Sequence, residues 1–335
     1  MLNVVFYSPT RDEELKWKTY DVDGNEVEMT ETTSTNRPIS FACDTMINGD
    51  SFFAYDSRIL SFNGQMPSLV TANSMFECTN ITKVHFNDEM ANFNSVKSGA
   101  SMFAECPRLE SVKIELNSLV NGEKMFYKSP ITTLECPSFK SVLYGQYMFS
   151  KTGLTSFSHD LSNLIDASYI FAETPLTSFD SKLSNVKILD GAFNKGSSLT
   201  SFNTDTLDKV ESAERAFYNT KINNWCYTLP ALKNGKNMFY GNTTLTSFTS
   251  SLSSLVEGDG MFTNCKLDGQ SVMHIVDSLP KHDDGGVHNI AIGINCGDVD
   301  AEKNELAALA EFDNWETLNS TLVSKGWTVT WGFNK

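Results

Sequence analysis

The chain has 335 residues, with 26 Lys and Arg against 41 Asp and Glu, and its formal net charge at pH 7 is −15. Because phosphate contacts need clustered basic side chains, this acidic balance argues against nucleic acid as a partner. No apolar stretch is long enough to cross a bilayer, and the first residues lack the apolar core and cleavage site of a signal peptide. We therefore expect neither export nor membrane insertion. A chain of this length forms either several domains or an elongated array.

Residues 1–40 contain two predicted strands, at 3–8 and 16–22, and the Asp23-Gly24 pair that follows is typical of a tight hairpin turn. We expect this β-hairpin segment either to cap the array that follows or to dock the chain onto a larger assembly.

Residues 41–267 repeat one apolar template ten times, at spacings of 22 to 27 residues. Each copy ends on a phenylalanine, which we call the anchor. Such self-similarity predicts a solenoid in which each coil packs only against its neighbours. The anchors are Phe53, Phe76, Phe103, Phe126, Phe149, Phe171, Phe193, Phe217, Phe239 and Phe262.

The positions before each anchor have a fixed character. The residues ten, seven and one before it are apolar in every copy, and the last of these is usually methionine. The residue four before it is Gly or Ala in nine of ten copies, with Leu189 as the exception, and we expect this small residue to let adjacent coils approach. A period of three favours 3₁₀-like turns or irregular coil over an α-helix.

A second apolar pair, spaced by three residues, follows most anchors, and the local sequence is often LTSF. Its β-prone composition predicts one short strand per coil, stacked in parallel with its copies. The predicted fold is an α+β repeat solenoid of about ten 22–27-residue coils, with a β-hairpin N-terminal cap and an α/β C-terminal cap.

Residues 268–335 depart from the template and form the predicted C-terminal cap. We expect a helix from about Asp268 to Leu279 with the aspartate as its N-cap, and then a strand at 288–294. A helix at 301–312, another that ends at Gly326 and a final strand at 327–333 complete the segment. Its role is to cover the last coil, because a solenoid end otherwise exposes its core.

The order of an LxxF strand, LxxL and G/A-x-x-M-F with a following cysteine or threonine resembles the BspA-type leucine-rich repeat, over residues 43 to about 267. This resemblance implies a leucine-rich-repeat-like stack and a non-enzymatic binding role. The helix, strand, helix, strand order of the last segment resembles BspA-like repeat proteins encoded by phages and prophages of gut Bacteroidota.

Polar residues flank the buried aromatic residue of several predicted strands. They form a flat ladder with little charge, which either hydrogen-bonds a glycan or is simply what a solvated parallel sheet tolerates. The ladder consists of Ser156, Ser158, Ser178, Asp180, Ser201, Asn203, Ser247 and Thr249.

Tyrosines occupy slots just after the anchor or two before it, and other coils hold Ser, Ala, Asn or Lys there. We expect these tyrosines to be exposed and to stack on sugar rings or anchor a protein interface; partial packing between coils is the alternative. They are Tyr127, Tyr147, Tyr169, Tyr218 and Tyr240.

No catalytic, cofactor or metal site is predicted. The loop Lys281–His288 concentrates two histidines and two carboxylates, but we interpret it as an exposed Gly-rich connection because no nucleophile has an obvious partner. Cysteines after three of the anchors, at Cys78, Cys106 and Cys265, are expected to be structural thiols.

These features predict a non-enzymatic binding or structural protein of a phage virion, made in the host cytoplasm, that attaches to a host surface glycan or protein or contacts other virion proteins. A BspA-type adhesin on the bacterial cell surface is the alternative, and a polysaccharide hydrolase a weaker one, because no pair of carboxylates in a cleft can be named. A homo-oligomer is compatible with either setting.

Overall fold

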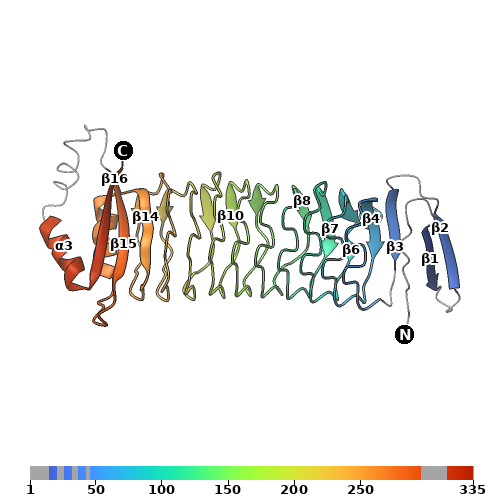
Figure 1. The fold of residues 1–335 in the computed structure, drawn as a ribbon, viewed down its shortest axis with the longest axis horizontal. Coiled ribbons are helices and arrows are strands. Elements are labelled where there is room, and N and C mark those ends of the chain that lie inside the picture. Colours follow the sequence, from blue (N-terminus) through green and yellow to red (C-terminus); the bar gives the residue numbers. More distant parts are fainter. Residues whose placement is uncertain (1–14, 21–25, 32–36, 43–45, 296–314, 335) are drawn as a thin grey trace.

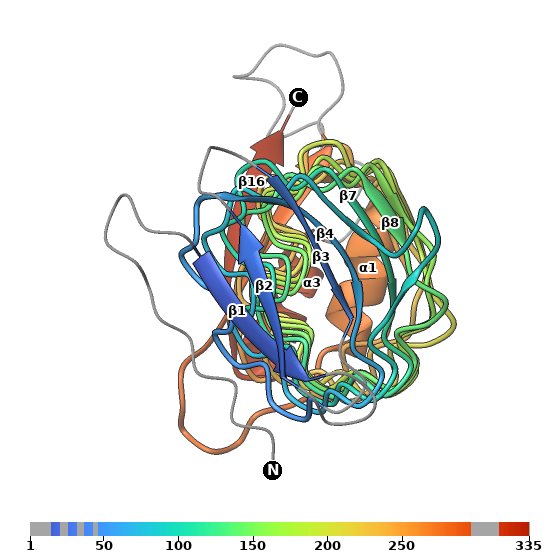
Figure 2. The same ribbon diagram turned by 90° about the vertical axis from the view of Figure 1, so that its right-hand side faces the viewer.

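A computed structural model describes residues 15–20, 26–31, 37–42, 46–295 and 315–334. The chain forms a long, gently curved stack of coils, with a two-stranded hairpin at one end and helices and longer strands at the other (Figure 1). Seen along the stack, successive coils superpose closely, as expected when the same slots are filled in each coil (Figure 2).

The hairpin consists of β1 (Leu15–Tyr20) and β2 (Glu26–Glu31), which pair antiparallel on either side of the predicted turn. The turn itself and the strand expected at 3–8 lie outside the described residues. β3 (Arg37–Ala42) pairs in parallel with β4 (Ile59–Gln65), so the parallel ladder already begins within the segment assigned to the N-terminal cap.

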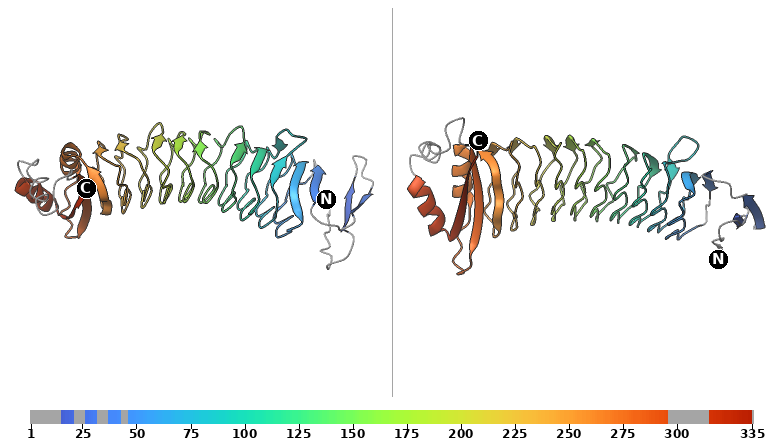
Figure 3. Two further views of the ribbon diagram at one scale, coloured as in Figure 1. Left: turned by 90° about the horizontal axis from the view of Figure 1, so that it is seen from above. Right: turned by 45° about the horizontal axis from the view of Figure 1, so that its top comes forward.

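Short parallel strands then recur once per coil, along one side of the stack (Figure 3), at the positions that the apolar pairs predict. One group continues from β4 through β5, β7 and β8, with the two-residue β6 beside β7; β9, β10 and β11 form a second group and β12 and β13 a third. The strands are β5 (Lys83–His85), β6 (Ala91–Asn92), β7 (Ser111–Glu115), β8 (Thr133–Glu135), β9 (Ser156–Phe157), β10 (Ser178–Asp180), β11 (Ser201–Asn203), β12 (Asn224–Trp225) and β13 (Ser247–Phe248).

A second parallel ladder, which the sequence did not reveal, runs through the residue five before each anchor. Single bridges join these residues from each coil to the next, through Asn48, Thr71, Ser98, Asn121, Tyr144, Asp166, Ile188, Ser212, Asn234 and Glu257.

The anchor itself sits in a tight turn that bonds both internally and to the next coil. Around Phe103, the amides of Ser101, Phe103 and Glu105 donate to carbonyls of the following coil, while Met102 N donates to Gly99 O within the turn at 3.0 Å. The three-residue spacing of this internal bond agrees with the predicted 3₁₀-like turn.

Backbone φ is positive two residues before and two residues after the anchor in all ten coils, and most of these residues are not glycine. Ser101 has φ 55° and Glu105 has φ 54°. Left-handed residues bend the chain between amides that point toward the neighbouring coil, so the turn can join the stack without becoming a helix.

The core is a continuous column of anchor rings. Rings of consecutive anchors stack with centroids 5.2 to 5.7 Å apart from Phe53 to Phe262. The position four residues before each anchor, which we call the small slot, lies against the next coil. A Cβ placed on Gly145 would lie 3.0 Å from Leu164 Cδ1 and 3.2 Å from Ile170 Cδ1. The expectation that this slot governs the approach of adjacent coils is therefore confirmed.

The C-terminal segment contains α1 (Gly269–Ser278), β15 (His288–Asn295), α3 (Trp315–Ser324) and β16 (Trp327–Asn334). The Asp268 side chain accepts a hydrogen bond from Ser271 N, which confirms the predicted N-cap. The helix expected at 301–312 lies outside the described residues. Neither described helix is long and apolar enough to cross a membrane.

The last coil differs from the expected template. Where a tight turn was predicted around Phe262, the chain forms the long strand β14 (Gly258–Leu267), which pairs in parallel with β15, as β15 does with β16. The neighbour of β14 is the regular strand β15 rather than another turn, so residues Gly258–Leu267 are extended and pair with β15. Gly260 and Asn264 keep the positive φ of the other coils, and the register with β15 shifts between the paired residues that flank them.

Candidate functional site

The predicted polar ladder faces outward from the parallel strands. Its eight residues are exposed or half-exposed, whereas the aromatic residue between each pair is buried. Strand pairing aligns Ser156, Ser178 and Ser201 across three coils, with Asp180 beside Asn203. Ser247 is aligned instead with Asn224, a residue that the sequence analysis did not select.

This polar face is hollowed between β11 and β12, where neighbouring strands are not paired. A depression of about 210 Å³ opens there, and every residue that lines it is uncharged. The lining consists of Thr200, Ser201, Phe202, Asn203, Ile222, Asn223, Asn224, Trp225, Cys226 and Tyr227.

Two aromatic residues shape the depression. Trp225 is 1% exposed and lies at its base, and within the described part of the chain its indole Nε1–H is buried without a hydrogen-bond partner. Tyr227 spans the gap: its hydroxyl donates to Phe202 O at 2.8 Å and accepts from Thr204 N at 3.3 Å. The Tyr227 hydroxyl therefore satisfies two main-chain groups at the edge of β11, where β12 is not paired.

Ser201 and Asn203 were predicted from the sequence, but Asn223 and Asn224 on the opposite wall were not, because their coil lacks the LTSF sequence. A signal was present, since Trp225 is the only tryptophan in a slot that holds Phe, Val or Leu in the other coils.

The five tyrosines are half-buried rather than fully exposed. Tyr147 and Tyr169 stack with ring centroids 4.8 Å apart, Tyr218 and Tyr240 stack at 5.0 Å, and Tyr127 meets Tyr147 edge-on at 6.0 Å. The expected exposure is therefore only partial, and the geometry is that of the alternative, partial packing between coils: in the two stacked pairs, one face of each ring is covered by its partner.

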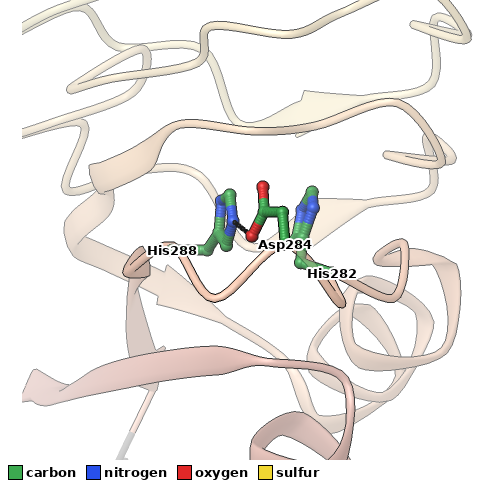
Figure 4. Close-up of side chains that lie close together, drawn as sticks. All are labelled: His282, Asp284 and His288. Carbon is green, nitrogen blue, oxygen red and sulfur yellow. Dashed lines mark hydrogen bonds and ion pairs between the residues drawn. The ribbon is translucent and has the colours of Figure 1, made fainter.

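The segment Lys281–His288, which forms the end of the α1–β15 loop and the start of β15, also brings side chains together, contrary to its interpretation as an exposed connection. The His282 and His288 rings stack with centroids 3.6 Å apart, and His288 Nε2 lies 3.1 Å from Asp284 Oδ1 (Figure 4). Hydrogen bonds to the Val256 carbonyl and to Asp284 raise the pKa of His288. The amide of Gly286 and the His288 ring lower the pKa of Asp284.

Two of the three selected cysteines, Cys106 and Cys265, pack as small core residues, whereas Cys78 is half-buried. Cys106 is buried, and its thiol donates to the carbonyl of Phe76 at 3.0 Å; Cys265 donates to Phe239 O at 3.3 Å. Burial raises the pKa of Cys106 to about 11, so this group is a thiol at neutral pH.

Comparison with protein families matches the BspA type leucine rich repeat region, in six copies, over residues 70–200 and 165–282. No curated protein and no solved structure matches the chain. Repeats of this family typically form non-enzymatic binding or structural domains. The matched residues span more than half of the sequence and coincide with the stacked coils, so the chain belongs to the BspA-type leucine-rich-repeat family.

Proposed function

We propose that this protein is a non-enzymatic recognition protein whose polar strand face binds a neutral polar ligand, a host surface glycan in the first instance. The observation that carries this function is the depression between β11 and β12, which is lined only by uncharged residues.

The chemistry of the lining suits a carbohydrate. Ser201, Asn203 and Asn224 supply hydroxyl and amide groups that both donate and accept hydrogen bonds, as sugar hydroxyls do. Ligand sites combine an apolar surface with a few oriented polar groups, and the half-buried Tyr227 ring provides apolar surface here, packed against the buried Phe202 and Trp225. The aligned serines of β9 and β10 extend the same polar face over further coils. A chain of several sugars fits such an extended face better than one small molecule does.

The setting that we propose is the surface of a phage virion, where the chain attaches to the host or contacts other virion proteins. The support is the resemblance of the C-terminal segment to phage-encoded BspA-like proteins. The alternative setting is the bacterial cell surface, where the chain would act as an adhesin, and the family match supports this one.

Binding is tested with two matched serine variants and capsular polysaccharide from a gut Bacteroidota strain. Ser201→Arg fills the depression, whereas Ser156→Arg places the same side chain at the aligned position of the same face, two coils away. We expect Ser201→Arg to abolish retention on immobilised polysaccharide and Ser156→Arg to keep most of it. Equal retention of both variants and the unchanged protein would remove the depression from the mechanism.

The setting is tested separately. Mass spectrometry of purified virions should detect the chain, whereas an adhesin would be cleaved when intact bacterial cells are treated with protease. A chain found in neither fraction contradicts both settings and leaves the binding experiment to stand on its own.

A further inference from the structure

Three side chains from the end of the α1–β15 loop and the start of β15 meet in an arrangement that the proposed function does not use. One potential ligand atom from each of His282, Asp284 and His288 lies within 4.8 Å of the other two. Figure 4 shows the three side chains on the same side of the loop. Asp284 is exposed, His282 is half-buried and His288 is buried, so the cluster opens to solvent on its Asp284 side.

Each imidazole is held by a main-chain carbonyl of the last coil. His282 Nε2 lies 3.0 Å from Leu255 O, and His288 Nδ1 lies 3.0 Å from Val256 O. A carbonyl oxygen only accepts hydrogen bonds, so both of these ring nitrogens carry the proton. Histidines that bind metals are commonly oriented in this way, with one ring nitrogen bonded to a carbonyl or carboxylate and the other left for the ion.

The remaining nitrogen of His288 faces an acceptor. In the neutral ring, Nε2 carries a lone pair, and it lies 3.1 Å from Asp284 Oδ1, which also carries lone pairs. Two acceptors at this distance repel unless something positive lies between them or beside them. A second proton on the ring can fulfil this role, and so can a cation shared by both groups.

We propose that His282, Asp284 and His288 bind one divalent transition-metal cation of the Zn²⁺ type. Two imidazoles and one carboxylate are the borderline nitrogen and oxygen donors that such ions prefer, whereas Ca²⁺ and Mg²⁺ prefer oxygen alone. The exposed side of Asp284 leaves room for water to complete the coordination shell.

The position of the cluster suggests what the ion does. His282 lies in the loop that joins α1 to β15 and His288 is the first residue of β15, while the carbonyls that orient them belong to the last coil, shortly before β14. The Trp327 ring, at the start of β16, packs against both imidazoles, with centroid distances of 5.1 and 5.7 Å. A bound ion would therefore hold the two imidazoles in place and stabilise their hydrogen bonds to the last coil of the solenoid.

The test uses the full chain without an affinity tag, stripped with a chelator and titrated with Zn²⁺ by calorimetry. We expect one site per chain, and a melting temperature that rises with Zn²⁺. Asp284→Asn removes an exposed ligand and should weaken the affinity roughly tenfold or more. The matched control is Asp283→Asn, which neutralises the adjacent exposed carboxylate that pairs with Lys281 and is not part of the cluster.

His288→Gln should abolish binding, but it alters a buried side chain and could disturb the fold, so the Asp284 and Asp283 pair decides the outcome. The proposal is overturned if the unchanged protein binds no Zn²⁺, or if Asp283→Asn and Asp284→Asn weaken binding equally. Zn²⁺ binding without an effect on glycan retention would leave the proposed function intact, and loss of retention in Ser201→Arg says nothing against the metal site.

Discussion

At the residue scale, the fit between coils depends on pairs of complementary size. The small slot of one coil lies against the residue directly before the anchor of the next, as Gly145 lies against Ile170. Leu189 is the exception to the small slot, and the same register places Ala216 opposite it, where most coils have methionine. Both residues are fully buried. At this contact the large residue is in the first coil and the small residue in the next, the reverse of most contacts, and the total volume is similar. Cores tolerate exchanges that conserve volume.

This complementarity predicts how substitutions at Gly145 and Ile170 combine. Gly145→Leu should lower the free energy of unfolding by about 1–3 kcal/mol through overpacking. Adding Ile170→Ala makes room, so the double variant should be more stable than the sum of the two single effects by about 1 kcal/mol or more. Denaturant unfolding of the four proteins measures this coupling. Ile222→Ala, which lies coils away, is the control and should add independently; coupling of the same size for both alanines would contradict the assigned contact.

The burial of the cysteine side chains predicts which of them react with an alkylating reagent. Burial raises the pKa values of Cys106 and Cys136 to about 11, whereas Cys226 is exposed. Because the thiolate is the reactive form, iodoacetamide at pH 8 should modify Cys226 and spare the two buried residues. Their modification should appear only as the pH approaches 11 or the chain unfolds. Peptide mass spectrometry reads each site separately, and rapid labelling of Cys106 at pH 8 in the folded chain would show that its slot is open.

At the scale of the element, the turn around each anchor is the unit that repeats. Its amides point alternately into the turn and toward the next coil, and the two residues of positive φ make this alternation possible. Most are Ser, Asn, Lys, Glu or Tyr, and two of them are the stacked Tyr147 and Tyr169. Left-handed backbone is unfavourable for such residues, so the stacked neighbours hold the turn in place.

The left-handed conformation can be tested at Ser101, which has φ 55°. Ser101→Val should lower the free energy of unfolding by about 1–2 kcal/mol, since a β-branched side chain is strained there. Ser101→Gly should be neutral or stabilising, because glycine adopts this conformation without a steric cost. Thermal melting of the two variants checks the assignment, and an order of stability with valine above glycine would contradict it.

The parallel ladders show that element-scale pairing is not uniform. The strands on the polar face break between β8 and β9 and again between β11 and β12, while the second ladder continues through every coil from Asn48 to Glu257. The continuous ladder and the stacked anchors keep the coils together. The polar face can therefore open locally at β12 without separating the stack.

At the scale of the whole molecule, stability comes from stacking. The anchor and the apolar slots of each coil are buried against the neighbouring coils, so no coil is expected to fold alone. The ends of such an array need protection, and here β14 is paired with β15 in the C-terminal sheet.

Removal of the C-terminal segment tests this requirement. A chain that stops after Leu267 leaves β14 without β15 and uncovers the last coil, including Leu252 and Phe248, which are buried in the whole protein. We expect the truncated chain to melt at a lower temperature and to associate in size-exclusion chromatography. A monomer with unchanged melting would mean that the segment has another role than covering the solenoid.

The sequence by itself determined the coils, their anchors, the short parallel strands and the size rule at the coil contact, because each is recorded in the identity of side chains at regular spacing. Leu189 shows what side-chain spacing leaves out. It departs from the size rule, and only the stacking of the coils, which places Ala216 opposite it, explains the departure. The second ladder, which includes Thr71 and Ser98, produces no pattern in the sequence, because it is built from main-chain groups that every residue carries.

Only the tertiary structure decided where the polar face is hollow and which side chains meet after the last coil of the solenoid. The depression depends on the absence of pairing between β11 and β12, and the His282, Asp284 and His288 cluster depends on the carbonyls of Leu255 and Val256. The physical reason is the same in both cases. A site depends on how neighbouring coils and the segment after them are placed in space, whereas the periodic sequence specifies only which face of each coil is buried.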